Sequence, residues 1–170
     1  MPFRMLALRA ILALALLSGA GGSAAETLTG VVFVVIDGDT VLFRPDPVPA
    51  GARAFLKLRL ADIDAPEKDQ PHGEAAARAL KVLVLDQRVQ VDTVATDAYG
   101  RTIARINRGG VQVNMELVRQ GHAWALSRYR RNADLLAAQH AARRTQRGLW
   151  QDARPTPPWV WRRERSAGDR

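Results

Sequence analysis

The sequence predicts an α+β domain, mainly β, in which a five-stranded barrel carries about three α-helices on its outside. Three observations lead to this fold class. Five short β-branched and apolar segments follow one another, one alanine-rich segment with helical spacing interrupts them, and two further helical segments close the domain. A small barrel of this kind is typical of the OB fold, whose open face binds oligonucleotides.

The first strands are predicted to form a hairpin. Residues 27–36 are β-branched and apolar, residues 40–44 continue the pattern, and the Asp-Gly pair between them is a strong hairpin signal. After a proline-rich loop, residues 53–60 alternate, which places Arg59 on one face of a third strand. Pro66 cannot continue that strand as a ladder member.

A helix and two further strands follow. Ala76, Leu80 and Leu83 recur at helical spacing, which predicts a helix from residue 73 to about 86. The remaining strands are predicted at residues 88–95 and 101–107, with a short strand after the turn at 107–110.

Two helices are expected to close the domain. Asn114 is predicted to cap a helix over residues 115–120 that Gly121 ends, and a longer helix runs from residue 133 to about 147. Three prolines follow Asp152, so we expect the C-terminal tail to be irregular.

Residues 1–25 are predicted to be a signal peptide. Arg4 and Arg9 precede a short apolar run, and small residues lead up to Ala25. An uncleaved anchor is the alternative, although the run is well short of the roughly 20 residues that span a bilayer. We therefore expect three segments: a signal peptide (1–25), a domain (26–150) and a Pro/Trp/Arg-rich tail (151–170). The protein is expected to be a monomer that is exported to the periplasm or secreted, without stable membrane insertion after cleavage.

The amino-acid composition excludes several kinds of site and indicates the charge of the partner. The chain has no cysteine, which excludes a disulfide framework, a thiol nucleophile and a cysteine-type zinc site. Its three histidines are far apart in the sequence, which argues against zinc altogether. The formal net charge of +8 favours an anionic partner such as nucleic acid, an acidic polysaccharide or an anionic membrane face, although codon bias toward arginine is a simpler explanation.

Carboxylates gather at two predicted strand ends. Asp37 and Asp39 flank the glycine of the first turn, and Asp62, Asp64 and Glu67 follow the third strand. Each motif alone is more often a tight turn or a solvated strand exit. If the two strand ends lie together, their carboxylates can converge on a hard cation, which prefers oxygen ligands.

Two arginines accompany these carboxylates. Arg59 precedes Asp64 by five residues, and Arg101 follows a tight turn that begins at Asp97. Either arginine alone is more simply a partner in an exposed ion pair, which is common and weak. Together with a cation, two guanidinium groups describe a phosphodiester site, because arginine binds phosphate with two hydrogen bonds and stabilises the charge of a phosphoryl transition state. Glu67 can orient or deprotonate an attacking water in such a site.

Three sequence blocks resemble, in order, the signature motifs of the staphylococcal nuclease (thermonuclease) family. They are residues 35–41 (VIDGDTV), 59–67 (RLADIDAPE) and 97–101 (DAYGR). Further similarity at residues 113–121 and 148–150 extends the resemblance over roughly residues 28–150. Each motif alone is weak, whereas five in order are specific.

The resemblance implies an OB-fold barrel with a Ca²⁺-dependent phosphodiesterase site. It implies cleavage of DNA and RNA with little sequence specificity and a preference for single strands. Water attacks phosphorus in line in this scheme and leaves 3′-phosphate ends. Asp39, Asp64 and the backbone carbonyl of Ala65 are implied to be the Ca²⁺ ligands.

The remaining implied roles concern substrate and water. Glu67 matches the residue that positions or activates water, and Arg59 and Arg101 match the two arginines that bind the phosphate. Tyr99 and Tyr129 are implied to contact the nucleotide, and stacking on them suits an enzyme without sequence preference.

Two other functions stay open. A catalytically weak or inactive OB-fold module that binds nucleic acid is expected to have lost an acidic or arginine residue of the site, and none is missing from the sequence. An envelope-associated protein that holds acidic glycans or lipids accounts for the charge and the apolar N-terminal segment, but not for three ordered motifs.

Overall fold

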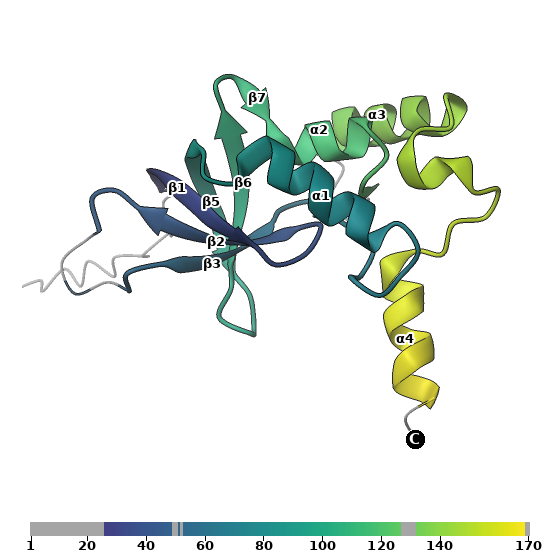
Figure 1. The fold of residues 1–170 in the computed structure, drawn as a ribbon, viewed down its shortest axis with the longest axis horizontal. Helices are drawn as coiled ribbons and strands as arrows, with labels where there is room; N and C mark the ends of the chain where they lie inside the picture. The colour runs from purple at the N-terminus through teal and green to yellow at the C-terminus, as the bar shows by residue number, and fades with distance from the viewer. Residues whose placement is uncertain (1–25, 49–50, 52, 127–131, 169–170) are drawn as a thin grey trace, which may run out of the picture.

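Five strands form the predicted closed barrel (Figure 1). A computed structural model describes residues 26–48, 51, 53–126 and 132–168, so the predicted signal peptide and Tyr129 lie outside the described residues. The barrel strands are β1 (Thr27–Val35), β2 (Thr40–Pro45), β3 (Leu56–Leu60), β5 (Arg88–Thr96) and β6 (Thr102–Arg108). They pair in the order β3-β2-β1-β5-β6, and a parallel pairing between β3 and β6 closes the barrel.

Short strands extend this framework at two places. Strand β7 (Val111–Gln112) pairs with the end of β6. Strands β4 (Ile63–Asp64) and β8 (Trp124–Ala125) form a separate antiparallel pair, which places Asp64 opposite Trp124. Neither β4 nor β8 is predicted from the sequence, because two residues are too few for an alternating pattern.

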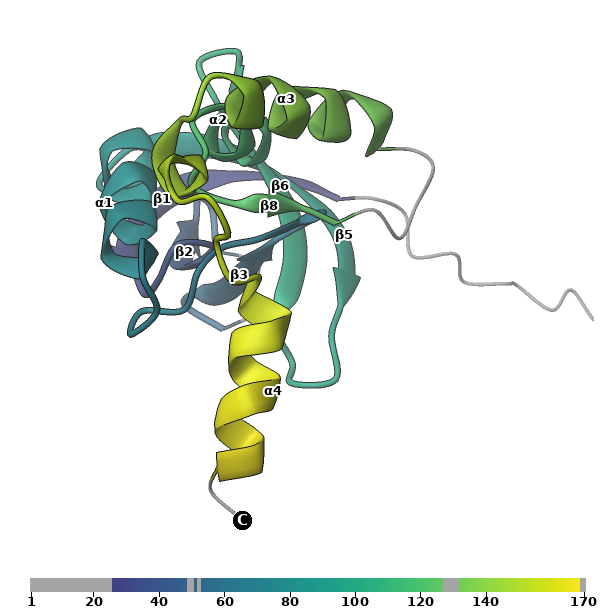
Figure 2. The same ribbon diagram turned by 90° about the vertical axis from the view of Figure 1, so that its right-hand side faces the viewer.

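Three helices lie on one side of the barrel, the first two packed against its strands and the third packed mainly on the second (Figures 1 and 2). They are α1 (Gly73–Val84), α2 (Val113–Arg119) and α3 (Ala133–Arg144). The periodicity of α1 is confirmed, since Ala76, Leu80 and Val84 are fully buried in the core cluster. None of the helices among the described residues is both long and apolar enough to cross a membrane.

The prediction that Asn114 caps α2 is wrong. Gln112 is the cap, and its side chain accepts a hydrogen bond of 2.6 Å from the backbone N–H of Met115. Asn114 is buried within the first turn of the helix, where its amide accepts from the N–H of Ile106 and donates to the carbonyl of Ala61. The asparagine therefore ties α2 to the barrel instead of starting the helix.

The prediction of an irregular tail is also wrong beyond residue 157. The 3₁₀ turn η2 (Gly148–Gln151) is followed by a short linker and then by α4 (Pro158–Gly168). The carbonyl of Pro157 accepts from the N–H groups of Val160 and Trp161, so Pro158 occupies the first helical position. Proline is well suited to that position, because its missing N–H has no intrahelical partner there and its φ is already helical. The prolines thus begin a helix rather than prevent one.

Helix α4 stands away from the barrel (Figures 1 and 2). It extends in the same direction as the turn between β5 and β6. At its start, the ring of Trp159 packs edge-on against Trp124, with 5.6 Å between centroids. Trp124 in turn belongs to a small buried cluster that joins α3 to η2 and includes Leu149 and Trp150.

Candidate active site

A cavity of about 620 Å³ lies where the β1–β2 turn, β3, β4, the β5–β6 turn and α4 meet. Seven of the eight site residues predicted from the sequence line it, and the eighth, Tyr129, lies outside the described residues. The seven are Asp39, Arg59, Asp64, Ala65, Glu67, Tyr99 and Arg101. The two acidic strand ends therefore do converge.

The β1–β2 turn holds Asp39 against the segment after β4. The Oδ2 atom of Asp39 accepts a hydrogen bond of 2.7 Å from the backbone N–H of Ala65, and its Oδ1 accepts one of 3.1 Å from the Thr40 hydroxyl. Gly38 is required for this approach, because a Cβ there would lie 2.6 Å from the Cβ of Ala65 and 2.7 Å from that of Ala76. The Asp-Gly-Asp spacing is thus a packing requirement as well as a turn signal.

Burial makes the Asp39 carboxylate costly to ionise. Its side chain is only 9% exposed. Burial raises the pKa of Asp39 from its ordinary 3.8 to about 7, although the positive charge of Arg59 opposes this, and the negative charges of Asp37 and Asp64 raise it further. A cation bound here would relieve that cost.

Arg59 joins the two aspartates. Its Nη1 lies 3.0 Å from Asp39 Oδ2, and its Nη2 donates to Asp64 Oδ1 at 2.7 Å. Nη1 also donates to the backbone carbonyls of Leu60 and Ile63, both at 3.0 Å. The guanidinium of Arg59 is therefore engaged with the acidic pair, and its role in binding phosphate stays a prediction.

Arg101 is placed differently, at the tip of the β5–β6 hairpin. Asp97 accepts from the backbone N–H groups of Tyr99 and Arg101 through Oδ1, and from Nε of Arg101 through Oδ2 at 2.7 Å. Because Asp97 holds only Nε, the two Nη atoms of this guanidinium, which lines the cavity, can bind an anion. The Tyr99 ring beside it is 85% exposed, which suits stacking on a base.

The residue that sequence reasoning missed is Arg162, from α4. Its Nη2 lies 2.8 Å from Asp64 Oδ2, and its Nη1 lies 2.5 Å from Glu67 Oε1. Treating the tail as irregular removed any reason to place this arginine near residues 64–67. The signal that could have found it is the Pro-Pro pair at 157–158, read as a helix start, with Arg162 and Arg165 one turn apart.

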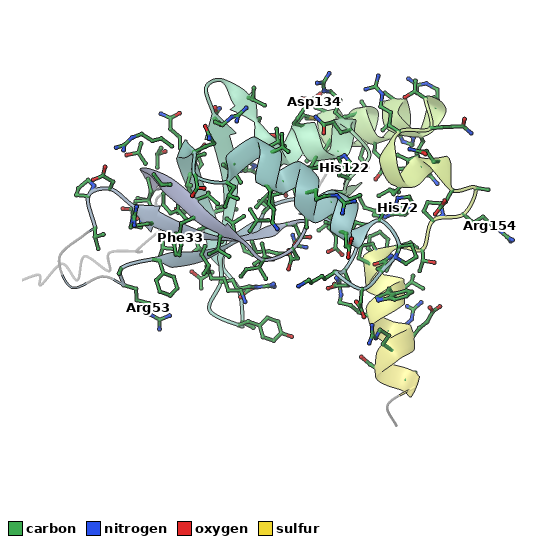
Figure 3. All side chains as sticks on the ribbon, viewed as in Figure 1. Phe33, Arg53, His72, His122, Asp134 and Arg154 are labelled. Carbon is green, nitrogen blue, oxygen red and sulfur yellow. The ribbon has the colours of Figure 1, made fainter. Side chains whose placement is uncertain are left out.

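His72 and His122 do not line this cavity and lie near each other beside α1 (Figure 3). Burial lowers the pKa of His122, and the proximity of His72 lowers it further. Nε2 of His72 is 2.8 Å from Asp152 Oδ2, in the segment that follows η2.

The donors at the site fit a hard divalent cation. Asp39, Asp64 and the carbonyl of Ala65 offer oxygen atoms only, as Ca²⁺ prefers. Within the described ranges, no cluster of three or more His, Asp or Glu side chains is arranged to hold a metal. The predicted ligand set therefore consists of two carboxylates and a backbone oxygen, and water or substrate would supply the other ligands of a bound cation.

Comparison with known proteins shows clear relatives. Residues 57–152 match the family described as staphylococcal nuclease homologue. The chain is 43% identical over 173 residues to Protein ParB of Escherichia coli, across 92% of this chain and 91% of that protein. It is 39% identical over 134 residues to an uncharacterised endonuclease of Escherichia coli (78% and 84%), and 36% identical over 145 residues to the micrococcal nuclease of Shigella flexneri (79% and 80%).

Proposed function

Since this chain belongs to the staphylococcal nuclease family and is a nuclease, we propose that it is an exported, Ca²⁺-dependent enzyme that cuts DNA and RNA with little sequence specificity and prefers single strands. Cleavage proceeds by in-line attack of water and leaves 3′-phosphate ends. The apolar segment at residues 1–25, which has the pattern of a signal peptide, supports export.

One observation carries this proposal. Two acidic strand ends, which are ordinary turns when taken singly, meet in one cavity together with Glu67 and Arg101. Structural ion pairs alone do not require a desolvated carboxylate such as Asp39 next to a second one, because burying like charges is costly. A cation bound between the two strand ends would compensate these buried charges, which supports a metal site here.

The metal would be held by Asp39, Asp64 and the Ala65 carbonyl, and it would neutralise charge on the phosphate oxygens as a Lewis acid. Arg101, oriented through its Nε by Asp97, binds the phosphate and stabilises the charge that develops on it. A guanidinium group gives up a proton reluctantly, so we assign Arg101 charge stabilisation rather than general acid catalysis. Glu67 accepts a proton from the attacking water or orients it.

The assigned roles are separable by kinetics. We expect Glu67→Gln and Arg101→Ala each to slow single-turnover cleavage of 5′-labelled single-stranded DNA about 100-fold or more, with a smaller loss of DNA binding. Glu74→Gln and Arg105→Ala are the matched controls, because they alter an exposed glutamate and an exposed arginine that do not line the cavity. Equal losses of rate and binding would count against both assignments. Fragments that lose phosphate to a 3′-phosphatase would establish that cleavage leaves 3′-phosphate ends. Fragments that already carry 3′-hydroxyls would refute it.

A further inference from the structure

We propose that α4 is a strap that competes with the metal, because Arg162 occupies the same carboxylate oxygens that a cation requires. This inference rests on the proposed function, since it concerns the regulation of the same site. While Arg162 contacts Asp64 and Glu67, the strap is closed and lowers the affinity of the site for Ca²⁺. When Ca²⁺ binds, the strap is released.

The contacts of Asp64 show why the two must compete. One carboxylate oxygen accepts from Arg59 at 2.7 Å, and the other lies 2.8 Å from Arg162. Both oxygens of this buried carboxylate are therefore engaged by guanidinium groups. A cation that uses Asp64 must displace or crowd one of them.

Arg162 is the guanidinium that can leave. The Arg59 side chain is 14% exposed and is also held by two backbone carbonyls, whereas the Arg162 side chain is 48% exposed. Arg162 also pairs with Glu67, the residue expected to handle water. Its displacement thus frees a metal-binding oxygen and the water-activating carboxylate in one step.

The attachment of α4 suits reversible release. In α4 only Pro158 is buried, Val160 and Trp161 are half-buried, and residues 162–168 are exposed, so little apolar surface holds down the part of the helix that carries Arg162. Beyond Arg162, the helix is held to the same acidic segment by an ion pair between Arg165 and Asp69. Partly exposed ion pairs are weak and are screened by salt.

The beginning of α4 forms a more permanent connection. Trp159 packs on Trp124, and the side-chain amide of Gln70 donates to the carbonyl of Thr156 at 2.6 Å. The helix can therefore swing about a fixed base without leaving the protein. Because coupling is reciprocal, the factor by which Arg162 weakens Ca²⁺ binding equals the factor by which Ca²⁺ favours release of Arg162.

Calorimetric titration of the purified protein with CaCl₂ tests the competition. We expect Arg162→Gln to bind Ca²⁺ about tenfold more tightly than the wild type, a typical size for coupling between two ligands. Lys57→Gln is the matched control, because this lysine lines the same cavity and makes no ion pair in the part of the chain that the structure describes. If both variants tighten Ca²⁺ binding equally, loss of positive charge alone explains the effect and the strap is refuted.

Hydrogen exchange of residues 158–168, measured by mass spectrometry at sub-second labelling times, tests the release. We expect Ca²⁺ to speed exchange in this segment of the wild type, and Arg162→Gln to exchange quickly without Ca²⁺. Unchanged exchange while Ca²⁺ binds would overturn the strap and leave the nuclease proposal intact. If neither the wild type nor Arg162→Gln binds Ca²⁺, the proposed metal site itself is wrong, and the strap with it.

Discussion

Arg59 supports the strongest prediction about the stability of the site. Its guanidinium lies between Asp39 and Asp64, two carboxylates whose side chains are 9% and 5% exposed. Arg59→Ala removes their shared positive partner, so Asp39 loses its guanidinium partner and Asp64 keeps Arg162 alone. It also removes hydrogen bonds to two backbone carbonyls.

The expected cost is large relative to the stability of a small domain. Removing one partner of a buried ion pair typically costs about 3–5 kcal/mol, against a total of about 5–15 kcal/mol for most domains. We expect Arg59→Ala to lose about 3–5 kcal/mol at pH 8. The loss should shrink at pH 5, because Asp39 has a folded-state pKa raised to about 7 and takes up a proton there, which removes the unpaired charge.

Urea unfolding followed by tryptophan fluorescence, in the presence of a chelator, measures this cost. Arg105→Ala is the control, since that arginine pairs with Asp62 and its side chain is 44% exposed. The double variant Arg59→Ala/Asp64→Asn should regain part of the loss, because it removes the second charge. A loss below about 1 kcal/mol for Arg59→Ala, similar to an exposed pair, would refute the reasoning.

Three further predictions concern separate parts of the molecule. Asp39→Ala should weaken Ca²⁺ binding at least tenfold in calorimetry, because it removes one of two carboxylate ligands, and an unchanged titration would exclude Asp39 from the metal site. Asn114→Leu should lower the free energy of unfolding by about 2–4 kcal/mol, because it strands the buried backbone groups that the amide satisfies, and a loss below about 1 kcal/mol would contradict that role. Burial lowers the pKa of His122 below its ordinary 6.5, so the folded state binds fewer protons and stability should fall as pH drops through about 6.5. Urea midpoints at pH 7.5 and 5.5 should differ less in His122→Gln than in the wild type, and equal differences would contradict this.

Much of the fold was predictable because its signals are local. The Asp-Gly turn, the alternation in β3 and the apolar spacing of α1 each depend on neighbouring residues only. The meeting of the two acidic strand ends in one cavity was predictable for a different reason. The motifs are weak singly, but their order restricts which strand ends can meet, and the close packing of Gly38 against Ala65 and Ala76 shows how the fold brings them together.

The parts that could not be predicted depend on distant contacts. Asn114 has the residue type of a helix cap, yet its amide bonds to Ala61 and Ile106, which pattern analysis does not bring near it. Arg162 contacts Asp64 across 98 positions of sequence, from a helix that the proline content of the tail argues against. Sequence patterns predict the position of neither side chain, because tertiary contacts determine both positions.

Release of acid-soluble nucleotides from heat-denatured DNA tests the central claim most directly. The wild type and Glu67→Gln are each assayed with Ca²⁺ and with a calcium chelator. We predict release only by the wild type with Ca²⁺. Release that persists in the chelator would contradict the assigned metal dependence, and release by Glu67→Gln at the wild-type rate would contradict the assigned site. No release in any arm, with the DNA still bound in a gel-shift assay, would indicate a nucleic-acid-binding module instead of a nuclease.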